Sequence, residues 1–294
     1  FPVGLTCEDR VFNMRVLPLA SRVAESNRVE YHYFMNMGSI SLGGLSQRAM
    51  QILEADELMV GYARASGDER LVKLALDRQA KGAFSMLVKY ARFGITDAAH
   101  ASPAFRQRLP AACRFASAGI EAPCRVATSL HARAGAGGIC DLQRGNGKGK
   151  GLAVGKVLTI AMPCYNVERY LRRGLDSLAD ERLADDVEVI VVDDGSTDET
   201  ARIAQGYVER MPQLFRLVSK ENGGHGSAVN AGIDHAQGRY FRVVDGDDWV
   251  DTDGLVRVVE LLKASDADLF VDEKVEVDMT THARTHCHLP AGFR

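Results

Sequence analysis

The stretch that decides the fold is Val189-Ile190-Val191-Val192-Asp193-Asp194-Gly195-Ser196-Thr197-Asp198. Its four leading residues are apolar, as expected of a strand buried on both faces. A glycine turn follows, and Ser196 stands three residues before Glu199, which predicts a capping box that starts a helix. Ligands of open α/β sheets bind at the carboxyl ends of strands, so Asp193 and Asp194 are candidates to accept hydrogen bonds from ribose hydroxyls or a base N–H. The alternative is a helix cap beside a solvated aspartate.

A second acidic strand end favours the functional interpretation. Arg239-Tyr240-Phe241-Arg242-Val243-Val244 predicts a strand, and Asp245-Gly246-Asp247-Asp248-Trp249 follows it. Alternation along extended chain would project Asp245 and Asp247 to one side. Two hard oxygen ligands so placed suit Mg²⁺ or Mn²⁺ held together with a substrate diphosphate. The alternative, an acidic loop that caps a helix near Thr252, explains only one of the two acidic strand ends.

Composition excludes several classes of protein. The chain has 294 residues and a net charge of −3, so it carries no electrostatic footprint for nucleic acid and no basic membrane patch. None of its six cysteines forms a C-x-x-C pair, which argues against a zinc ribbon or a redox motif and for reduced thiols in a cytoplasmic protein. No apolar run reaches the length of a membrane span. Because the chain begins with Phe1 and not Met, we treat it as a fragment.

From residue 156 onward, strand and helix patterns alternate. Strands are predicted over 157–162, 187–193, 214–219, 239–244 and 268–277, and helices over 167–178, 197–211, 227–236 and 253–263. This alternation indicates a parallel sheet covered on both faces. The turn at 223–226 lacks G-x-G-x-x-G spacing, which argues against a dinucleotide-binding dehydrogenase.

Four motifs in this unit together resemble the nucleotide-sugar-binding half of a family 2 glycosyltransferase of the GT-A fold. They are Lys156-Val157-Leu158-Thr159-Ile160-Ala161-Met162-Pro163-Cys164-Tyr165-Asn166 with Glu168 and Tyr170, then Val192-Asp193-Asp194-Gly195-Ser196-Thr197-Asp198, then Asn222-Gly223-Gly224, then Asp245-Gly246-Asp247-Asp248. The resemblance covers residues 156 to about 278. It implies inverting, metal-dependent transfer of a sugar from a nucleotide-diphospho-sugar to an acceptor hydroxyl, in bacterial cell-surface polysaccharide or glycolipid synthesis.

The resemblance also implies a set of site residues and partners. The nucleotide-sugar-binding residues would be Pro163, Tyr165, Asn166, Glu168, Asp193, Asp194, Gly195, Asn222, Gly223 and Asp245. Asp245 and Asp247 would hold Mn²⁺ or Mg²⁺. The expected donor is a UDP-sugar, and the expected acceptor is a glycan or a lipid-linked molecule, with no nucleic acid as a partner. We expect a cytoplasmic protein, and peripheral association with the inner face of the membrane is left open.

Residues 1–43 resemble the end of a family 2 catalytic core. Glu8-Asp9 precedes apolar residues, as does a Glu-Asp pair that starts a helix beside the acceptor in that family. In that family the Asp of the pair is the expected catalytic base, which maps to Asp9. Residues 28–34 alternate like a strand. The alternative is an N-terminal helix cap with ordinary surface acids.

Between these two parts, a helical region over 44–122 and a linker over 123–155 are predicted. Apolar residues over 45–62 and 68–93 recur at helical spacing and are typical of packing helices, with short helices over 102–122. The linker is rich in glycine and cannot bury a core. Its Gly/Lys run lacks the G-x-x-x-x-G-K-[ST] spacing of a phosphate-binding loop.

The order of these parts is unusual, because the tail of one domain precedes the head of another. The simplest account is a piece of a tandem glycosyltransferase in which the domain at 156–294 is incomplete at its C-terminus. A rearranged single domain, with Asp9 folding back onto the second half, is the alternative. Two other functions stay open: a nucleotide-sugar-binding module without turnover, and a sugar-phosphate nucleotidyltransferase. The latter would need a basic Gly-rich loop where Pro163-Cys164-Tyr165-Asn166 stands.

Overall fold

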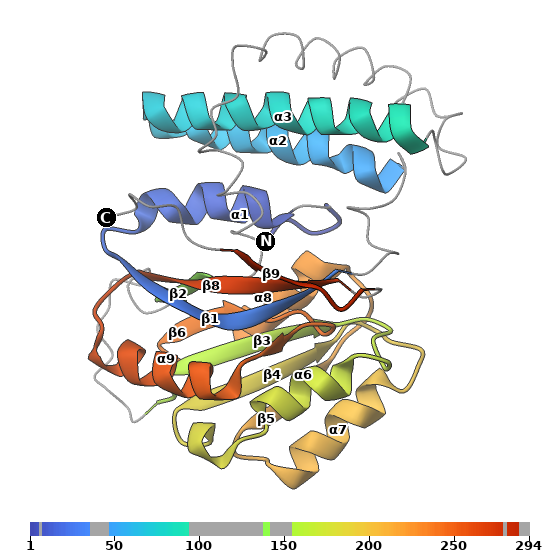
Figure 1. Ribbon diagram of the computed structural model, residues 1–294, viewed down its shortest axis with the longest axis vertical. Coiled ribbons are helices and arrows are strands. Elements are labelled where there is room, and N and C mark those ends of the chain that lie inside the picture. The colour runs from blue at the N-terminus through green and yellow to red at the C-terminus, as the bar shows by residue number, and fades with distance from the viewer. Residues whose placement is uncertain (6–7, 36–46, 94–137, 142–154, 279–280, 288–294) are drawn as a thin grey trace.

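The computed structural model describes residues 1–5, 8–35, 47–93, 138–141, 155–278 and 281–287 (Figure 1). The helices of the described residues are α1 (Glu8–Val16), α2 (Gln47–Ser66), α3 (Glu69–Phe93), α6 (Leu171–Leu178), α7 (Thr200–Arg210), α8 (His225–His235) and α9 (Thr252–Ala264). The strands are β1 (Val23–Met35), β2 (Gly138–Asp141), β3 (Leu158–Cys164), β4 (Val187–Asp193), β5 (Phe215–Ser219), β6 (Tyr240–Val243), β7 (Trp249–Val250), β8 (Leu269–Asp278) and β9 (Arg284–Cys287).

All of these strands belong to one sheet. Its order is β5-β4-β3-β6-β2-β8-β1-β7, and β9 pairs with β8. β3 lies parallel to both β4 and β6, and β5 lies parallel to β4. Every residue of β3 and β4 is buried, as expected of strands covered on both faces. The α/β fold and the parallel sheet predicted for the C-terminal half are therefore confirmed.

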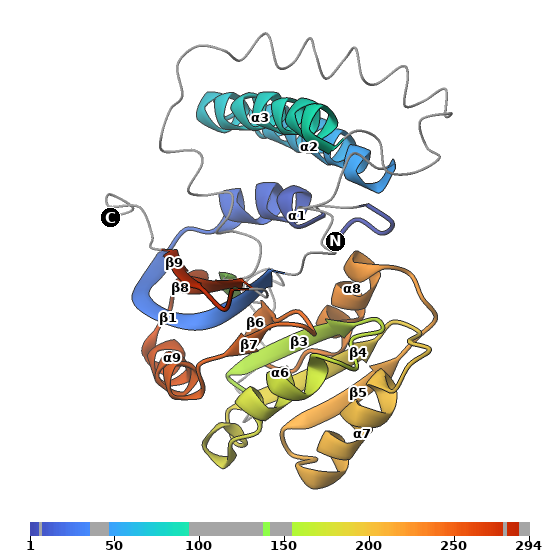
Figure 2. The same ribbon diagram turned by 45° about the vertical axis from the view of Figure 1, so that its right-hand side comes forward.

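The two faces of β3 contact different helices. Met162 packs in the same buried cluster as Leu171 and Leu175 of α6, whereas Ala161 packs with Val229 of α8. Figure 2 shows α6 and α7 together on the first of these faces. Because alternate residues of a strand point to opposite faces, the uninterrupted apolar run of β3 supplies both interfaces.

The N-terminal strand completes the sheet formed by the second half of the chain. β1 pairs in parallel with β8, from Val23↔Leu269 to Met35↔Asp278, and antiparallel with β7 (Figure 1). Residues 138–141 lie within the predicted linker but form β2, which pairs antiparallel with both β6 and β8. The glycine content predicted a linker here, but the backbone groups of β6 and β8 provide β2 with hydrogen-bond partners, which composition alone does not reveal. The rest of the predicted linker up to residue 154 and the short helices over 102–122 lie outside the described residues.

The predicted helical region contains two long helices. α2 and α3 pack on each other and α2 packs on α1, with Met14, Met59 and Ala75 in one buried cluster. A buried carboxylate, Asp56, pairs with Arg10 of α1 at 3.1 Å. Within the described part of the chain, no helix has the length and apolar character required to cross a bilayer.

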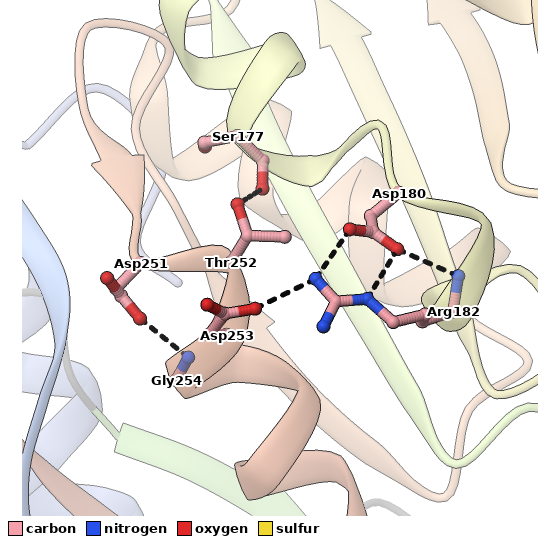
Figure 3. A network of polar contacts seen from close by, with 7 residues as sticks. All are labelled: Ser177, Asp180, Arg182, Asp251, Thr252, Asp253 and Gly254. Atoms are coloured by element: carbon pink, nitrogen blue, oxygen red, sulfur yellow. Dashed lines mark hydrogen bonds and ion pairs between the residues drawn. The ribbon is translucent and has the colours of Figure 1, made fainter.

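Polar contacts attach the start of α9 to the end of α6 (Figure 3). Thr252 donates its hydroxyl to the carbonyl of Ser177 at 2.8 Å, and Arg182 contacts both Asp180 and Asp253. The Asp251 carboxylate accepts from the Gly254 amide at 2.6 Å and caps α9. These contacts hold the segment between β6 and α9 against α6.

A buried ion pair joins β6 and β8, the two strands on either side of β2. The Arg242 guanidinium of β6 is 2.8 Å from the Asp272 carboxylate of β8, and neither side chain is exposed to solvent. The guanidinium also lies 5.2 Å from the ring centroid of Tyr31 in β1. Since an unpaired buried charge is costly, this pair ties β6 to β8 and to the N-terminal strand.

Candidate functional site

The carboxyl ends of β3, β4 and β6 meet at one edge of the sheet, as predicted. Cys164 ends β3 opposite Asp193, the last residue of β4. The pKa of the buried Cys164 thiol is raised well above its ordinary value, first by burial and then by the charges of Asp193, Asp245 and Asp247. The two acidic strand ends are 52 residues apart in the sequence, and both therefore lie near Cys164.

Three carboxylates gather after β6. Asp245, Asp247 and Asp248 each offer one oxygen, and these oxygens lie within 4.8 Å of one another. Strand alternation does not bring them together, because β6 ends at Val243 and the Asp248 amide donates to the Asp245 carbonyl at 3.0 Å across a turn. The predicted extended geometry is therefore wrong, although the predicted clustering is present. We call Asp245, Asp247 and Asp248 the acidic turn.

Gly246 lets the acidic turn lie against the end of β3. A Cβ at this position would be 2.9 Å from the Cys164 sulfur and 3.2 Å from the Pro163 carbonyl oxygen. Both distances are shorter than ordinary van der Waals contact, so a side chain would push the turn away from the strand. This close approach places the carboxylates beside the predicted nucleotide-site residues Pro163 and Asp193.

The acidic turn has the properties of a cation site. Burial, and then the charge of Asp245, raise the pKa of Asp247 to about 6. The turn thus holds negative charge that the protein compensates only in part, and its donors are hard carboxylate oxygens. That donor set fits Mg²⁺ or Mn²⁺.

Two residues that the sequence did not single out contact the acidic turn. Tyr31 of β1 is fully buried, and its hydroxyl donates a hydrogen bond to Asp248. His225, in the first turn of α8, places Nε2 at 2.9 Å from Asp245 Oδ1. The position of His225 directly after Asn222-Gly223-Gly224 was a usable signal, whereas the contact of Tyr31 depends on a pairing between distant strands.

Asp194 organises the turn that follows β5. Its carboxylate accepts from the Lys220 ammonium at 2.6 Å and from the amides of Gly223 and Gly224 at 3.0 and 2.8 Å. A Cβ on Gly195, whose φ is +74°, would be 2.9 Å from the Asn222 amide nitrogen. The predicted nucleotide-site residues Asp194, Gly195, Asn222 and Gly223 therefore belong to one packed unit.

The predicted capping box at 196–199 is wrong. α7 begins at Thr200, and its N-cap Glu199 makes no side-chain cap. The Ser196 amide donates to Asp193 Oδ1 at 3.0 Å, and its hydroxyl accepts from the Asn166 amide at 3.1 Å. Because the Ser196 hydroxyl is engaged by the neighbouring loop, it does not cap the helix.

Asn166 and Glu168 brace the same loop from the β3 side. Asn166 Oδ1 accepts from the Thr197 amide at 2.8 Å, and Glu168 Oε2 accepts from the Glu199 amide at 3.0 Å. Tyr165, between β3 and these residues, is 51% exposed and presents its ring to solvent. Among the predicted nucleotide-site residues after β3, Tyr165 therefore offers an accessible aromatic side chain.

Asp9, the predicted base, lies in the first turn of α1. This helix packs against α2. The assignment of Asp9 as the catalytic base stays a prediction.

Comparison with known proteins identifies the second half of the chain. Residues 159–293 match the family model described as "Glycosyl transferase family 2". The uncharacterized glycosyltransferase EpsJ of Bacillus subtilis is 37% identical over 113 residues, which are 38% of this chain and 32% of EpsJ. This chain spans about a third or less of the length of the first curated relatives that it matches.

Solved structures also match part of the chain. S. aureus TarS 1-349 in complex with UDP-GlcNAc is 30% identical, covers 37% of this chain and 31% of its own, and has a TM-score of 0.34. The mannosyltransferase PcManGT of Pyrobaculum calidifontis, in complex with GDP-Man and Mn²⁺, is 28% identical, covers 41% of this chain and 37% of its own, and has a TM-score of 0.34.

Proposed function

Since residues 159–293 are a glycosyltransferase family 2 domain, we propose that this chain transfers a sugar from a nucleotide-diphospho-sugar to an acceptor hydroxyl. The observation that carries the proposal is the acidic turn, whose three carboxylate oxygens lie within 4.8 Å of one another at the carboxyl end of β6. A carboxylate cluster in this place is suited to a divalent cation and the diphosphate that accompanies it.

We assign the cation to Asp245 and Asp247. A bound Mn²⁺ or Mg²⁺ supplies positive charge beside the diphosphate leaving group, where negative charge grows in the transition state. Asp248 is buried and accepts the hydrogen bond of Tyr31, so its first role is to hold the turn in shape. His225, at 2.9 Å from Asp245, orients that carboxylate.

The nucleotide would lie across the ends of β3, β4 and β5. The exposed ring of Tyr165 offers a surface for the base, and Asp193 offers carboxylate oxygen to ribose or base N–H groups. We assign Asn166, Glu168 and Asp194 to shaping these loops, and their hydrogen bonds to backbone amides support this assignment. The expected donor is a UDP-sugar, and the expected product belongs to cell-surface polysaccharide or glycolipid synthesis.

Inversion requires the acceptor oxygen to attack the anomeric carbon opposite the leaving diphosphate. The carbon–oxygen bond to the diphosphate breaks as the new glycosidic bond forms, and a carboxylate takes the acceptor hydroxyl's proton. Asp9 is our candidate for that base. An Asp9→Asn variant that keeps donor binding and loses transfer would support it, and a variant with unchanged transfer would remove it.

Calorimetric titration of UDP, with and without Mn²⁺, tests the proposed donor site. We expect binding that depends on Mn²⁺ and that is lost in Asp247→Asn. Asp185→Asn, which removes an exposed carboxylate outside the acidic turn, is the matched control and should bind as the wild type does. Binding that ignores both the metal and Asp247 would contradict the assignment.

The competing function is nucleotide-sugar binding without turnover. A donor-hydrolysis or transfer assay on the same preparations separates the two functions, because only the enzyme consumes bound donor. A panel of UDP, GDP and dTDP identifies the nucleotide if UDP alone does not bind.

A further inference from the structure

Trp249, the single tryptophan of the chain, lies against one histidine and one arginine side chain. The His32 ring of β1 stacks on Trp249 with 5.1 Å between centroids and 5° between planes. The Arg173 guanidinium carbon of α6 lies 3.2 Å from the Trp249 ring centroid. Trp249 itself is 7% exposed, so its ring is largely covered by these neighbours.

Strand β9 adds two more basic residues to the same face of the sheet. The register aligns His286 with Val275, Val275 with His32, and His32 with Trp249. Cross-strand partners point to the same face, so His286 lies on the side of Trp249. Arg284 is two residues earlier on β9 and therefore shares this face, and both β9 side chains are exposed. We call Arg173, His32, Arg284 and His286 the basic cluster.

The two arginines of the basic cluster lie close enough for the charge of one to act on the other. Burial and then the Arg284 charge lower the pKa of Arg173. Burial, Arg284, Arg173 and His286 lower the pKa of His32, and only Asp251 acts in the opposite direction. Asp251 also caps α9. Neither arginine forms an ion pair with any carboxylate of the described residues, so an anion bound here would relieve the repulsion between them.

The basic cluster is on the opposite side of the strands from the acidic turn. Tyr31 and His32 are consecutive residues of β1, and consecutive residues of a strand point to opposite faces. Tyr31 contacts Asp248 on one face, and His32 contacts Trp249 on the other. The donor diphosphate therefore has its own place at the acidic turn, and an anion in the basic cluster is a different group.

We propose that the basic cluster around Trp249 binds a phosphate group carried by the acceptor. Two guanidinium groups present forked N–H donors that match phosphate oxygens. Trp249 directly follows the acidic turn and lies in β7, the last strand of the sheet order. An acceptor whose phosphate binds here would therefore extend past β7 to reach the acidic turn. This inference rests on the proposed function, because it names the substrate class of that site as a phosphate-bearing acceptor.

Because Trp249 is the only tryptophan, its fluorescence reports on the basic cluster directly. The test titrates the full chain with inorganic phosphate or methyl phosphate at constant ionic strength, with chloride as the reference anion and without Mn²⁺ or UDP. We expect a saturable change with either phosphate and none with chloride. Arg284→Gln and Arg173→Gln should each weaken the response at least tenfold. Arg257→Gln, an exposed arginine of α9, should leave it unchanged.

Several results would overturn the proposal. One is a fluorescence response to chloride equal to that to phosphate, and another is phosphate binding in Arg284→Gln as strong as in the wild type. A third is displacement of phosphate by UDP with Mn²⁺, which would mean that phosphate binds at the donor site. A response only to phosphatidylglycerol vesicles would assign the cluster to a membrane surface instead. UDP titration of the same variants separates this test from that of the donor site, because we expect donor binding to be unchanged in Arg284→Gln. Circular dichroism melting confirms that each variant is folded.

Discussion

Tyr31 donates a hydrogen bond to Asp248, a residue 217 positions later in the chain. Both residues are buried, and Asp248 belongs to the acidic turn. Burial and the nearby Asp248 and Asp245 charges raise the pKa of Tyr31 well above its ordinary value, which keeps its hydroxyl protonated as a donor. The N-terminal strand therefore supports the shape of a site whose carboxylates all come from the other end of the chain.

Tyr31→Phe should destabilise the protein by removing this donor. A buried carboxylate that loses a hydrogen bond costs about 1–3 kcal/mol in the free energy of unfolding. Urea denaturation measures the change. Tyr62→Phe is the control, because Tyr62 is 40% exposed and its ring is kept, so we expect a change below about 0.5 kcal/mol there. Equal effects of the two substitutions would contradict the role given to Tyr31.

Asp247→Asn should stabilise the metal-free protein at neutral pH. The pKa of Asp247 is raised to about 6 in the folded chain, so the folded state holds a proton that the unfolded state has already released. Stability therefore falls as the pH rises from about 4 through 6. Removing the ionisable group should raise the free energy of unfolding by about 1–3 kcal/mol at pH 7.5, which is the energy equivalent of the pKa shift. Below pH 4 the substitution should leave the free energy of unfolding unchanged.

The same variant should lose the stabilisation that Mn²⁺ gives to the wild type, because a cation that binds only the folded state raises its melting temperature. Thermal melts at pH 4 and 7.5, with and without Mn²⁺, measure both effects. A variant that is less stable than the wild type at pH 7.5 and still responds to Mn²⁺ would refute this account of the acidic turn.

Asp194→Asn should loosen the turn after β5. The amide cannot replace a carboxylate that accepts from Lys220, Gly223 and Gly224 together, and the Lys220 charge loses its partner. We expect a loss of about 2–4 kcal/mol in unfolding free energy and faster hydrogen exchange at the Gly223 and Gly224 amides. Glu221→Gln, an exposed acid in the same turn, should change neither. Unchanged exchange in Asp194→Asn would show that other contacts hold the turn.

Two helical glycines should respond in opposite directions to alanine. A Cβ on Gly232 of α8 would lie 2.6 Å from the Ala161 Cβ, whereas a Cβ on Gly206 of α7 would meet nothing within 4 Å. Gly232→Ala should cost about 1–3 kcal/mol through overpacking, and Gly206→Ala should gain as much as about 1 kcal/mol from helix propensity. Chemical denaturation of the pair tests how closely α8 packs on the sheet. A stabilising Gly232→Ala would contradict that packing.

Parts of the site with a local cause could be predicted. The acidic ends of β4 and β6 follow apolar runs, and parallel strands bring their carboxyl ends to one edge, so the meeting of Asp193 with Asp245 and Asp247 followed from pattern alone. The capping box failed because the Ser196 hydroxyl has a competing partner, the Asn166 amide, on another loop. A spacing rule within one segment has no information about that partner.

The apolar pattern of the sequence was enough to predict the parallel strands β3, β4 and β5 with their helices, because each of these elements shows its apolar run or spacing within a few residues. It could not predict that β1 lies between β8 and β7, or that residues 138–141 join the sheet as β2. Strand pairing depends on which edge has unpaired backbone groups, and that edge exists only after the rest of the sheet has formed. The contact of Tyr31 with Asp248 and the gathering of basic residues around Trp249 were decided at that level, since they join residues whose separation along the chain carries no local signal.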